Sequence, residues 1–165
     1  MKTGVEWIRK WTWEAIRKKT RRQNELAYLF DTDTINLTFR NHPQVIARTA
    51  RTPAEDIFIS SLSAEELLRG ILSEINRARS RPTASIAALS LYLVDLLEGL
   101  AEFQILPYTD EAERLFRSFP ASVKRIGGMD CRIAAHAIVS GSIVITRNTQ
   151  DFARIPGVQL EDWSV

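Results

Sequence analysis

Four acidic residues of this 165-residue chain lie beside four separate apolar runs. They are Asp31 in YLFDTDTI, Glu66 in IFISSLSAEELLRG, Asp130 in GGMDCRIAAHAI and Asp151 in IVITRNTQDF. The whole chain has one cysteine and two histidines, so carboxylates are its main candidate ligands. Clustered carboxylates favour a hard cation such as Mg²⁺ or Mn²⁺. Such a cation neutralises phosphate charge and activates bound water, so the four acids suit phosphoryl chemistry if they converge.

The elements that must bring the acids together are the strands and helices of an α/β domain. Short apolar runs predict strands at 27–30, 57–62, 103–106 and 142–146, with a short fifth at 158–160; the run at 57–62 is also rich in β-branched and aromatic residues. Helical spacing predicts helices over 34–50 (interrupted near 42–43), 63–79, 83–100, 110–119 and 130–140. This alternation predicts a three-layer α/β/α domain with a central parallel sheet of four to five strands.

The order of elements predicts that the acids meet at one edge of that sheet. In open α/β sheets, ligands bind beyond the carboxyl ends of the strands. Asp31, Glu66 and Asp151 each follow a strand. Asp130 starts a helix that runs antiparallel to the next strand, so it is expected at the same edge. Without a cation the acids would repel one another, so the metal-free site should be strained or partly protonated.

Each acid also has a purely structural interpretation, which the sequence leaves open. Ser63 and Glu66 fit a capping box, with Ser63 at the N-cap of its helix. Asp130 fits an N-cap and Asp151 a turn residue. Asp31 is harder to explain this way, because a carboxylate against a buried strand is costly unless it is paired or binds a cation.

Composition places the chain among cytoplasmic globular proteins. It is 45% apolar and 25% charged, and a single cysteine, Cys131, cannot form an intramolecular disulfide. No apolar run reaches the roughly 18–20 residues needed to span a bilayer, and the start does not resemble a secretory signal. We therefore expect a cytoplasmic protein without a membrane partner.

Charge is uneven along the chain. Residues 1–27 carry a net +5 and the remainder −3, within a total of +2. We expect residues 1–25 to form a basic helical N-terminal extension and residues 26–165 to form the α/β domain. Three interpretations of the extension stay open: a solvated amphipathic appendage, a start codon placed upstream of the true one, or an arm that binds nucleic acid or a partner.

Four segments in order resemble the motifs of PIN-domain ribonucleases of the VapC toxin type. LFDTDTINL resembles the first motif, a strand ending in D-T-[ND], and ISSLSAEELLRG resembles I-S-x-x-[ST]-x-x-E-L-x-x-G, which selects Glu66 rather than Glu65. GGMDCRIAAHAI resembles D-x-x-I-A-A-x-A, and IVITRNTQDFARIPGVQLEDW resembles T-x-N-x-x-D-F with a terminal strand. The resemblance covers residues 27–165.

This resemblance implies a PIN-like fold and a Mg²⁺- or Mn²⁺-dependent endoribonuclease that is the toxin of a toxin–antitoxin pair. It implies Asp31, Glu66 and Asp130 as core metal-site acids and Asp151 as the fourth. Thr146 and Asn148 would position the site, with Asp33 in support. It also implies an RNA substrate, a cognate antitoxin lying across a helix-built groove, and a homodimer.

Two alternatives compete with this interpretation. FDTDTI partly resembles the D-x-D-x-[TV] motif of haloacid-dehalogenase-type phosphatases, with Asp31 as nucleophile and Asp33 as acid. That fit fails at Ile35, and no G-D-x-x-x-D segment follows. The other alternative is a nucleic-acid-binding PIN module with a weak catalytic site, against which the presence of all four acids argues.

Overall fold

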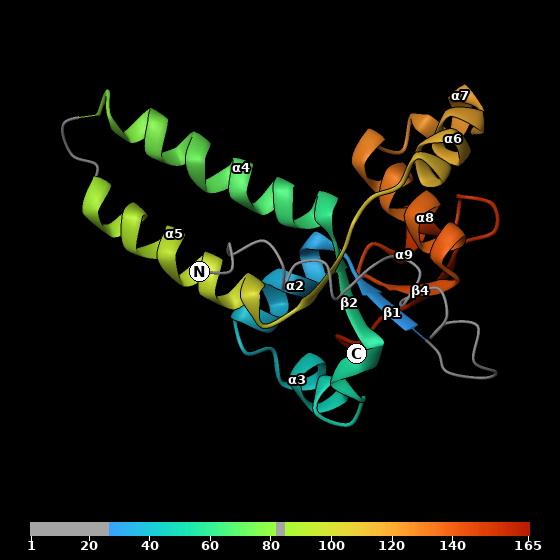
Figure 1. The fold of residues 1–165 in the computed structure, drawn as a ribbon, viewed down its shortest axis with the longest axis horizontal. Coiled ribbons are helices and arrows are strands. Elements are labelled where there is room, and N and C mark those ends of the chain that lie inside the picture. The colour runs from blue at the N-terminus through green and yellow to red at the C-terminus, as the bar shows by residue number, and fades with distance from the viewer. Residues whose placement is uncertain (1–26, 82–84) are drawn as a thin grey trace, which may run out of the picture.

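The computed structural model describes residues 27–81 and 85–165, so the predicted extension over 1–25 lies outside the described residues. The described residues form a five-stranded parallel sheet with the order β3-β2-β1-β4-β5 (Figure 1). The strands are β1 (Ala27–Phe30), β2 (Ile57–Ser60), β3 (Gln104–Leu106), β4 (Ser142–Ile145) and β5 (Gln159–Glu161).

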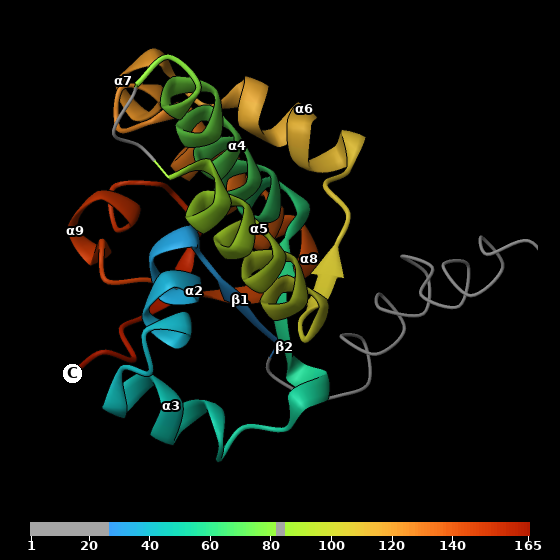
Figure 2. The same ribbon diagram turned by 90° about the vertical axis from the view of Figure 1, so that its left-hand side faces the viewer.

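Helices connect the strands and cover both faces of the sheet. They are α2 (Thr32–Phe39), α3 (Pro43–Thr49), α4 (Ser61–Ala78), α5 (Ile86–Ala101), α6 (Asp110–Ser118), α7 (Ala121–Lys124), α8 (Gly128–Ser140) and α9 (Thr149–Phe152), with a 3₁₀ turn at Ala54–Asp56. Helices α4 and α5 pack against each other as a long hairpin that projects from the sheet (Figures 1 and 2).

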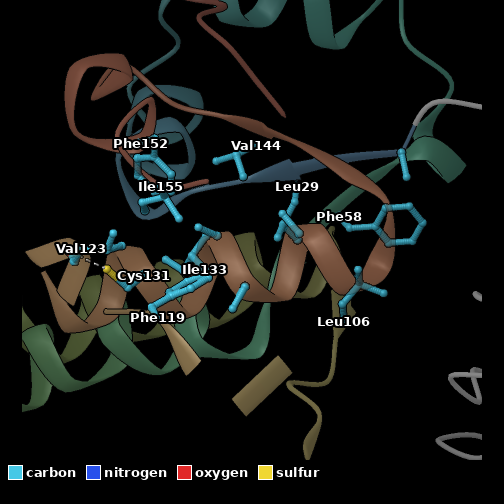
Figure 3. Close-up of a cluster of buried hydrophobic side chains, with 14 residues drawn as sticks. Leu29, Phe58, Leu106, Phe119, Val123, Cys131, Ile133, Val144, Phe152 and Ile155 are labelled. Carbon is cyan, nitrogen blue, oxygen red and sulfur yellow. Dashed lines mark hydrogen bonds between the residues drawn. The ribbon is translucent and has the colours of Figure 1, made fainter. Parts of the chain in front are cut away.

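Two hydrophobic cores, one on each face, make the domain three-layered. Neighbouring residues of a strand point to opposite faces, so Leu29 belongs to one core and Phe30 to the other. The core that contains Leu29 is closed by α8, with Cys131 and Ile133 packed under the sheet (Figure 3). The core that contains Phe30 is closed by α2 to α5. The predicted α/β/α architecture is therefore confirmed.

The structure corrects several predicted boundaries. Strand β2 ends at Ser60 rather than at residue 62, and α4 follows it without a loop. Helix α8 begins at Gly128, two residues before Asp130. The short helices α7 and α9 were not predicted, because four residues are too few to show helical periodicity. Within the described residues, no helix is long and apolar enough to cross a membrane.

Candidate active site

The order of the strands reverses between β1 and β4, and this point carries the candidate site. The chain moves from β1 to β2 and β3 on one side, and places β4 and β5 on the other. Ligand crevices of open α/β sheets lie at such switch points, beyond the carboxyl ends of the strands. The backbone N–H of Asp31 donates to the carbonyl of Ile145 at 3.1 Å, and the Thr34 hydroxyl donates to the same oxygen at 2.7 Å.

Asp31 is fixed at the end of β1 as the N-cap of α2. Its carboxylate accepts the backbone N–H of Thr34 at 2.7 Å, and only 6% of the residue is exposed. Burial raises the pKa of Asp31 to about 6, although hydrogen bonds from Thr146 and Thr34 oppose the rise. A capping role alone explains the Thr34 contact but does not remove this cost of burial. Asp31 is therefore the most deeply buried of the four acids, and burial disfavours its ionised form.

Glu66 does not cap its helix. The N-cap of α4 is Ser60, whose hydroxyl accepts the N–H of Leu62 at 3.1 Å. Ser63 lies inside the helix and is fully buried, so the predicted capping box is wrong. The Glu66 carboxylate instead accepts a hydrogen bond from the hydroxyl of Thr32 at 2.6 Å. This contact joins the first turn of α2 to the second turn of α4 and turns Glu66 toward the end of β1.

Asp130 is not an N-cap either, because α8 begins at Gly128 after an N-cap at Gly127. Asp130 sits in the first turn of α8, where the helix dipole favours a negative charge. Its pKa is nevertheless raised, first by burial and then by the charges of Glu66, Asp151 and Asp33. Asp130 lines the same pocket as Asp31 and Glu66.

One pocket of about 200 Å³ gathers most of the predicted residues. Its lining includes three of the four predicted acids, two of the predicted supporting residues, and two apolar side chains. The lining residues are Asp31, Thr32, Asp33, Glu66, Asp130, Ile133, Asn148 and Phe152. The structure thus brings together side chains from the end of β1, from the turn after β4, and from helices α2, α4, α8 and α9.

Asp33, Asp151 and Thr146 stand at the margins of this pocket. Asp33 is half exposed and pairs with Arg147 at 3.2 Å. Asp151 is outside the lining and pairs with Arg154 at 3.2 Å, one helical turn later. Thr146 is buried beneath the pocket, where its hydroxyl contacts Asp31 and accepts the N–H of Asn148 at 2.9 Å. Thr146 therefore orients both a predicted ligand and the turn that carries Asn148.

A buried histidine fixes two of the elements that carry the acids. His136 of α8 is fully buried, and burial lowers its pKa to about 4, so the imidazole is neutral. Its Nδ1 lies 3.0 Å from the hydroxyl of Ser60, which is the last residue of β2 and the N-cap of α4. The contact holds α8 against the start of α4, and so fixes Asp130 relative to Glu66.

The donor set of the pocket fits a hard cation. Its polar side chains offer carboxylate, hydroxyl and amide oxygens, which suit Mg²⁺ or Mn²⁺ and not a soft metal. Among residues 27–81 and 85–165, no three His, Cys, Asp or Glu side chains stand close enough to hold a metal as they are.

A parallel three-layer domain with carboxylates gathered at its switch point places the chain among open α/β proteins whose ligand site lies beyond the carboxyl ends of the strands. The chain belongs to the PIN-domain family, whose model matches residues 28–158. The family resemblance predicted from the four motifs is thereby confirmed. The family match also argues against the phosphatase alternative, in which Asp33 would have been the general acid.

Curated relatives are similar over most of the chain. The tRNA(fMet)-specific endonuclease VapC of Salmonella typhimurium is 30% identical over 84% of this chain and 98% of that protein. Ribonuclease VapC1 of Haemophilus influenzae strain R2866 is 26% identical over 84% of this chain and 99% of that protein. Among solved structures, DNA-bound VapBC from Salmonella typhimurium has a TM-score of 0.67 at 27% identity, covering 84% and 99% of the two chains.

Thr32 is the polar residue of the pocket lining that the sequence did not single out as functional; the apolar lining residues Ile133 and Phe152 were not singled out either. Thr32 lies between Asp31 and Asp33 in the first motif. Its position in the D-T-D segment at the end of a strand was the sequence feature that could have indicated a role in the site. Its partner Glu66 is 34 residues away, so the contact between them needed the fold.

Replacing Thr32 with valine should lower the turnover of RNA about tenfold to a hundredfold without unfolding the protein. Valine keeps the shape but removes the hydroxyl, so Glu66 loses the hydrogen bond that aims it at the pocket, and small misplacements cost rate. The measurement is kcat beside a urea unfolding curve, with Thr32→Ser as the matched control. Serine should restore most of the rate, and equal kcat in valine and wild type would exclude this role.

Proposed function

We propose that this chain is a Mg²⁺- or Mn²⁺-dependent endoribonuclease. The observation that carries the proposal is the convergence of Asp31, Glu66 and Asp130 on one small pocket, with pKa values of Asp31 and Asp130 raised by burial. Buried, mutually repelling carboxylates are stabilised by a bound cation. The VapC relatives, which are named as ribonucleases or as a tRNA endonuclease, support RNA as the substrate.

The residues divide into ligands and positioning groups. Asp31, Glu66 and Asp130 would hold the metal, which when bound supplies an activated water and a counter-charge for phosphate. Asp151 acts as a fourth acid by adding negative charge near Asp130, or by turning from Arg154 into the site. Thr146 holds Asp31, and Asn148 lines the pocket as a neutral donor and acceptor.

The protein acts as the toxin of a toxin–antitoxin pair. Support comes from similarity to solved toxin–antitoxin complexes, including VapBC of Salmonella typhimurium. A second support is the exposed apolar face of α5, formed by Leu91, Tyr92, Val94 and Leu97. Exposed apolar patches mark protein interaction sites. An antitoxin and a second copy in a homodimer are the proposed occupants, and cytoplasmic RNA is the proposed target.

Cleavage assays with the purified protein test this function directly. RNA should be cut in Mg²⁺ or Mn²⁺ and left intact in excess EDTA, and added metal should restore cutting. Asp130→Asn should lower the rate at least about a hundredfold, because it removes a negative ligand and its share of transition-state stabilisation. In cells, expression of the wild-type chain should halt growth, and expression of Asp130→Asn should not.

Asp95→Asn provides the matched control, since Asp95 is an exposed acid on α5 outside the pocket. It should cleave as wild type does. Cleavage that persists in EDTA, or an Asp130→Asn variant as active as Asp95→Asn, would refute the metal-dependent assignment.

A further inference from the structure

A second pocket, of about 620 Å³, opens beside the acidic one and shares Glu66 with it. It lies between α4 and the start of α8, and three arginines line it: Arg69, Arg77 and Arg132. We call this the arginine groove, with Gly70, Ser73 and Met129 as its other principal walls. An acidic pocket repels a polyanion, so a cationic surface that leads into it needs a functional explanation.

Two of the arginines are free to change partners. Arg69 pairs with Glu65, and Arg77 pairs with Glu74. Both ion pairs lie within α4, and all four side chains are at least half exposed. Exposed pairs of this kind contribute little to stability, so a phosphate can replace the glutamates. Arg69 and Arg77 are eight residues apart on α4, about 12 Å along the helix axis, and would therefore contact different phosphates of one strand.

The third arginine is held in place before any ligand arrives. The guanidinium of Arg132 stacks 4.0 Å above the ring of Phe116, and its Nε donates to Glu113 at 3.2 Å. Arg132 also follows Asp130 by two residues, at the opening of α8. A fixed, stacked guanidinium is suited to bind a phosphate, because little side-chain entropy is lost on binding.

Gly70 gives an independent indication that something approaches α4 closely here. Glycine inside a helix is unfavourable, and packing does not explain this one, because a Cβ at Gly70 would meet nothing within 4 Å. Gly99 of α5 is different, since a Cβ there would come within 2.6 Å of the Phe39 ring. Gly70 instead leaves an open hollow in the floor of the arginine groove, on the exposed face of α4.

We propose that the arginine groove binds the phosphodiester backbone of the RNA next to the scissile bond, with Gly70 leaving room for the strand. The proposal rests on the ribonuclease function above and adds the path by which the substrate enters the site. RNA is favoured over an acidic peptide because the groove opens at Glu66 into the carboxylate pocket.

Binding can be measured apart from cleavage with a fluorescent single-stranded RNA of mixed sequence, by anisotropy, in an Asp31→Asn background. The double change Arg69→Gln and Arg77→Gln should weaken binding at least about tenfold at low salt. It should also reduce the slope of log K against log salt by about 1.4, because each phosphate of a single strand that an arginine neutralises contributes about 0.7 to that slope. In the active protein the same pair should raise KM and leave kcat nearly unchanged.

Gly70→Gln tests the hollow without changing charge. It should weaken RNA binding several-fold while the Tm stays equal or rises, because glutamine is a better helix former than glycine. A merely structural role of Gly70 would lower the Tm instead.

Arg51→Gln is the control for net charge, since Arg51 is an exposed arginine just before β2, at the opposite edge of the sheet. It should bind RNA as the parent does.

Three outcomes of the binding measurements would overturn the proposal. One is unchanged RNA affinity and salt slope in the Arg69 and Arg77 double variant. Another is an equally weakened affinity in Arg51→Gln, which would reduce the effect to net charge. The last is normal RNA binding together with impaired binding of poly-glutamate, which would assign the groove to an acidic protein segment. If wild type cleaves in metal but the groove variants keep their KM, this proposal fails and the ribonuclease function stands.

Discussion

Replacing Asp31 with asparagine should lower RNA cleavage at least about a thousandfold and at the same time stabilise the metal-free protein. Asp31 is the most deeply buried of the predicted ligands and stands at the switch point between β1 and β4. Removing its charge takes away a metal ligand and the counter-charge that holds the cation. A thousandfold loss corresponds to about 4 kcal/mol of transition-state stabilisation.

The gain in stability follows from the same burial. The pKa of Asp31 rises from its ordinary value of 3.8 to about 6, so an ionised carboxylate costs the folded state roughly 3 kcal/mol at neutral pH. Asparagine carries no charge and still accepts the Thr34 N–H as an N-cap. Between about pH 4 and pH 6 the folded protein keeps a proton that the unfolded chain has lost, so wild-type stability falls as pH rises through this window.

Urea unfolding in EDTA at pH 4 and pH 7.5 measures this effect. The Asp31→Asn variant should exceed wild type by about 1–3 kcal/mol at pH 7.5, and the difference should shrink at pH 4. Adding Mg²⁺ should stabilise wild type and leave the variant unchanged, because ligands stabilise only the state that binds them. A variant that is less stable than wild type at pH 7.5, and that still cleaves RNA, would contradict both parts of the argument.

The positions of the strands and their parallel direction were predictable because the sequence signal for a strand is local. The central strands β1, β2 and β4 are short, mostly apolar runs, and buried parallel strands need no alternation. Once the sheet is parallel, the carboxyl ends meet, so Asp31 and Glu66 could be placed near each other from sequence alone. The oxygen-rich chemistry of the site followed from the scarcity of cysteine and histidine.

The details that failed depend on contacts between distant segments. Ser60, Ser61 and Ser63 are all acceptable N-caps by residue type, and only the end of β2 selects Ser60. The contact of Glu66 with Thr32 needs the sheet register and the start of two helices. Asp151 was predicted as the fourth acid of the site, with a turn residue as the alternative; it lies in α9, outside the pocket lining, and pairs with Arg154, a contact that the motif did not indicate.

Replacing Phe152 with alanine should produce the largest loss of stability among these variants, about 3–5 kcal/mol. Phe152 ends α9, is 1% exposed, and contributes to both the hydrophobic core and the wall of the carboxylate pocket. Figure 3 places its ring beside Ile155 at one end of the cluster. Truncation would leave a cavity directly behind the acids, so we also expect slower catalysis by the molecules that remain folded.

Phe58 offers a matched control, because it is a buried phenylalanine of the same cluster at the opposite end (Figure 3). Phe58→Ala should cost similar stability but leave kcat within about twofold at a temperature where the protein is folded. Phe152→Ala should lower kcat tenfold to a hundredfold there, since α9 supports the turn that carries Asn148. Urea unfolding and single-turnover cleavage at low temperature separate the two effects. Equal kcat losses in both variants would mean that Phe152 acts through global stability alone, and that the pocket does not depend on the position of α9.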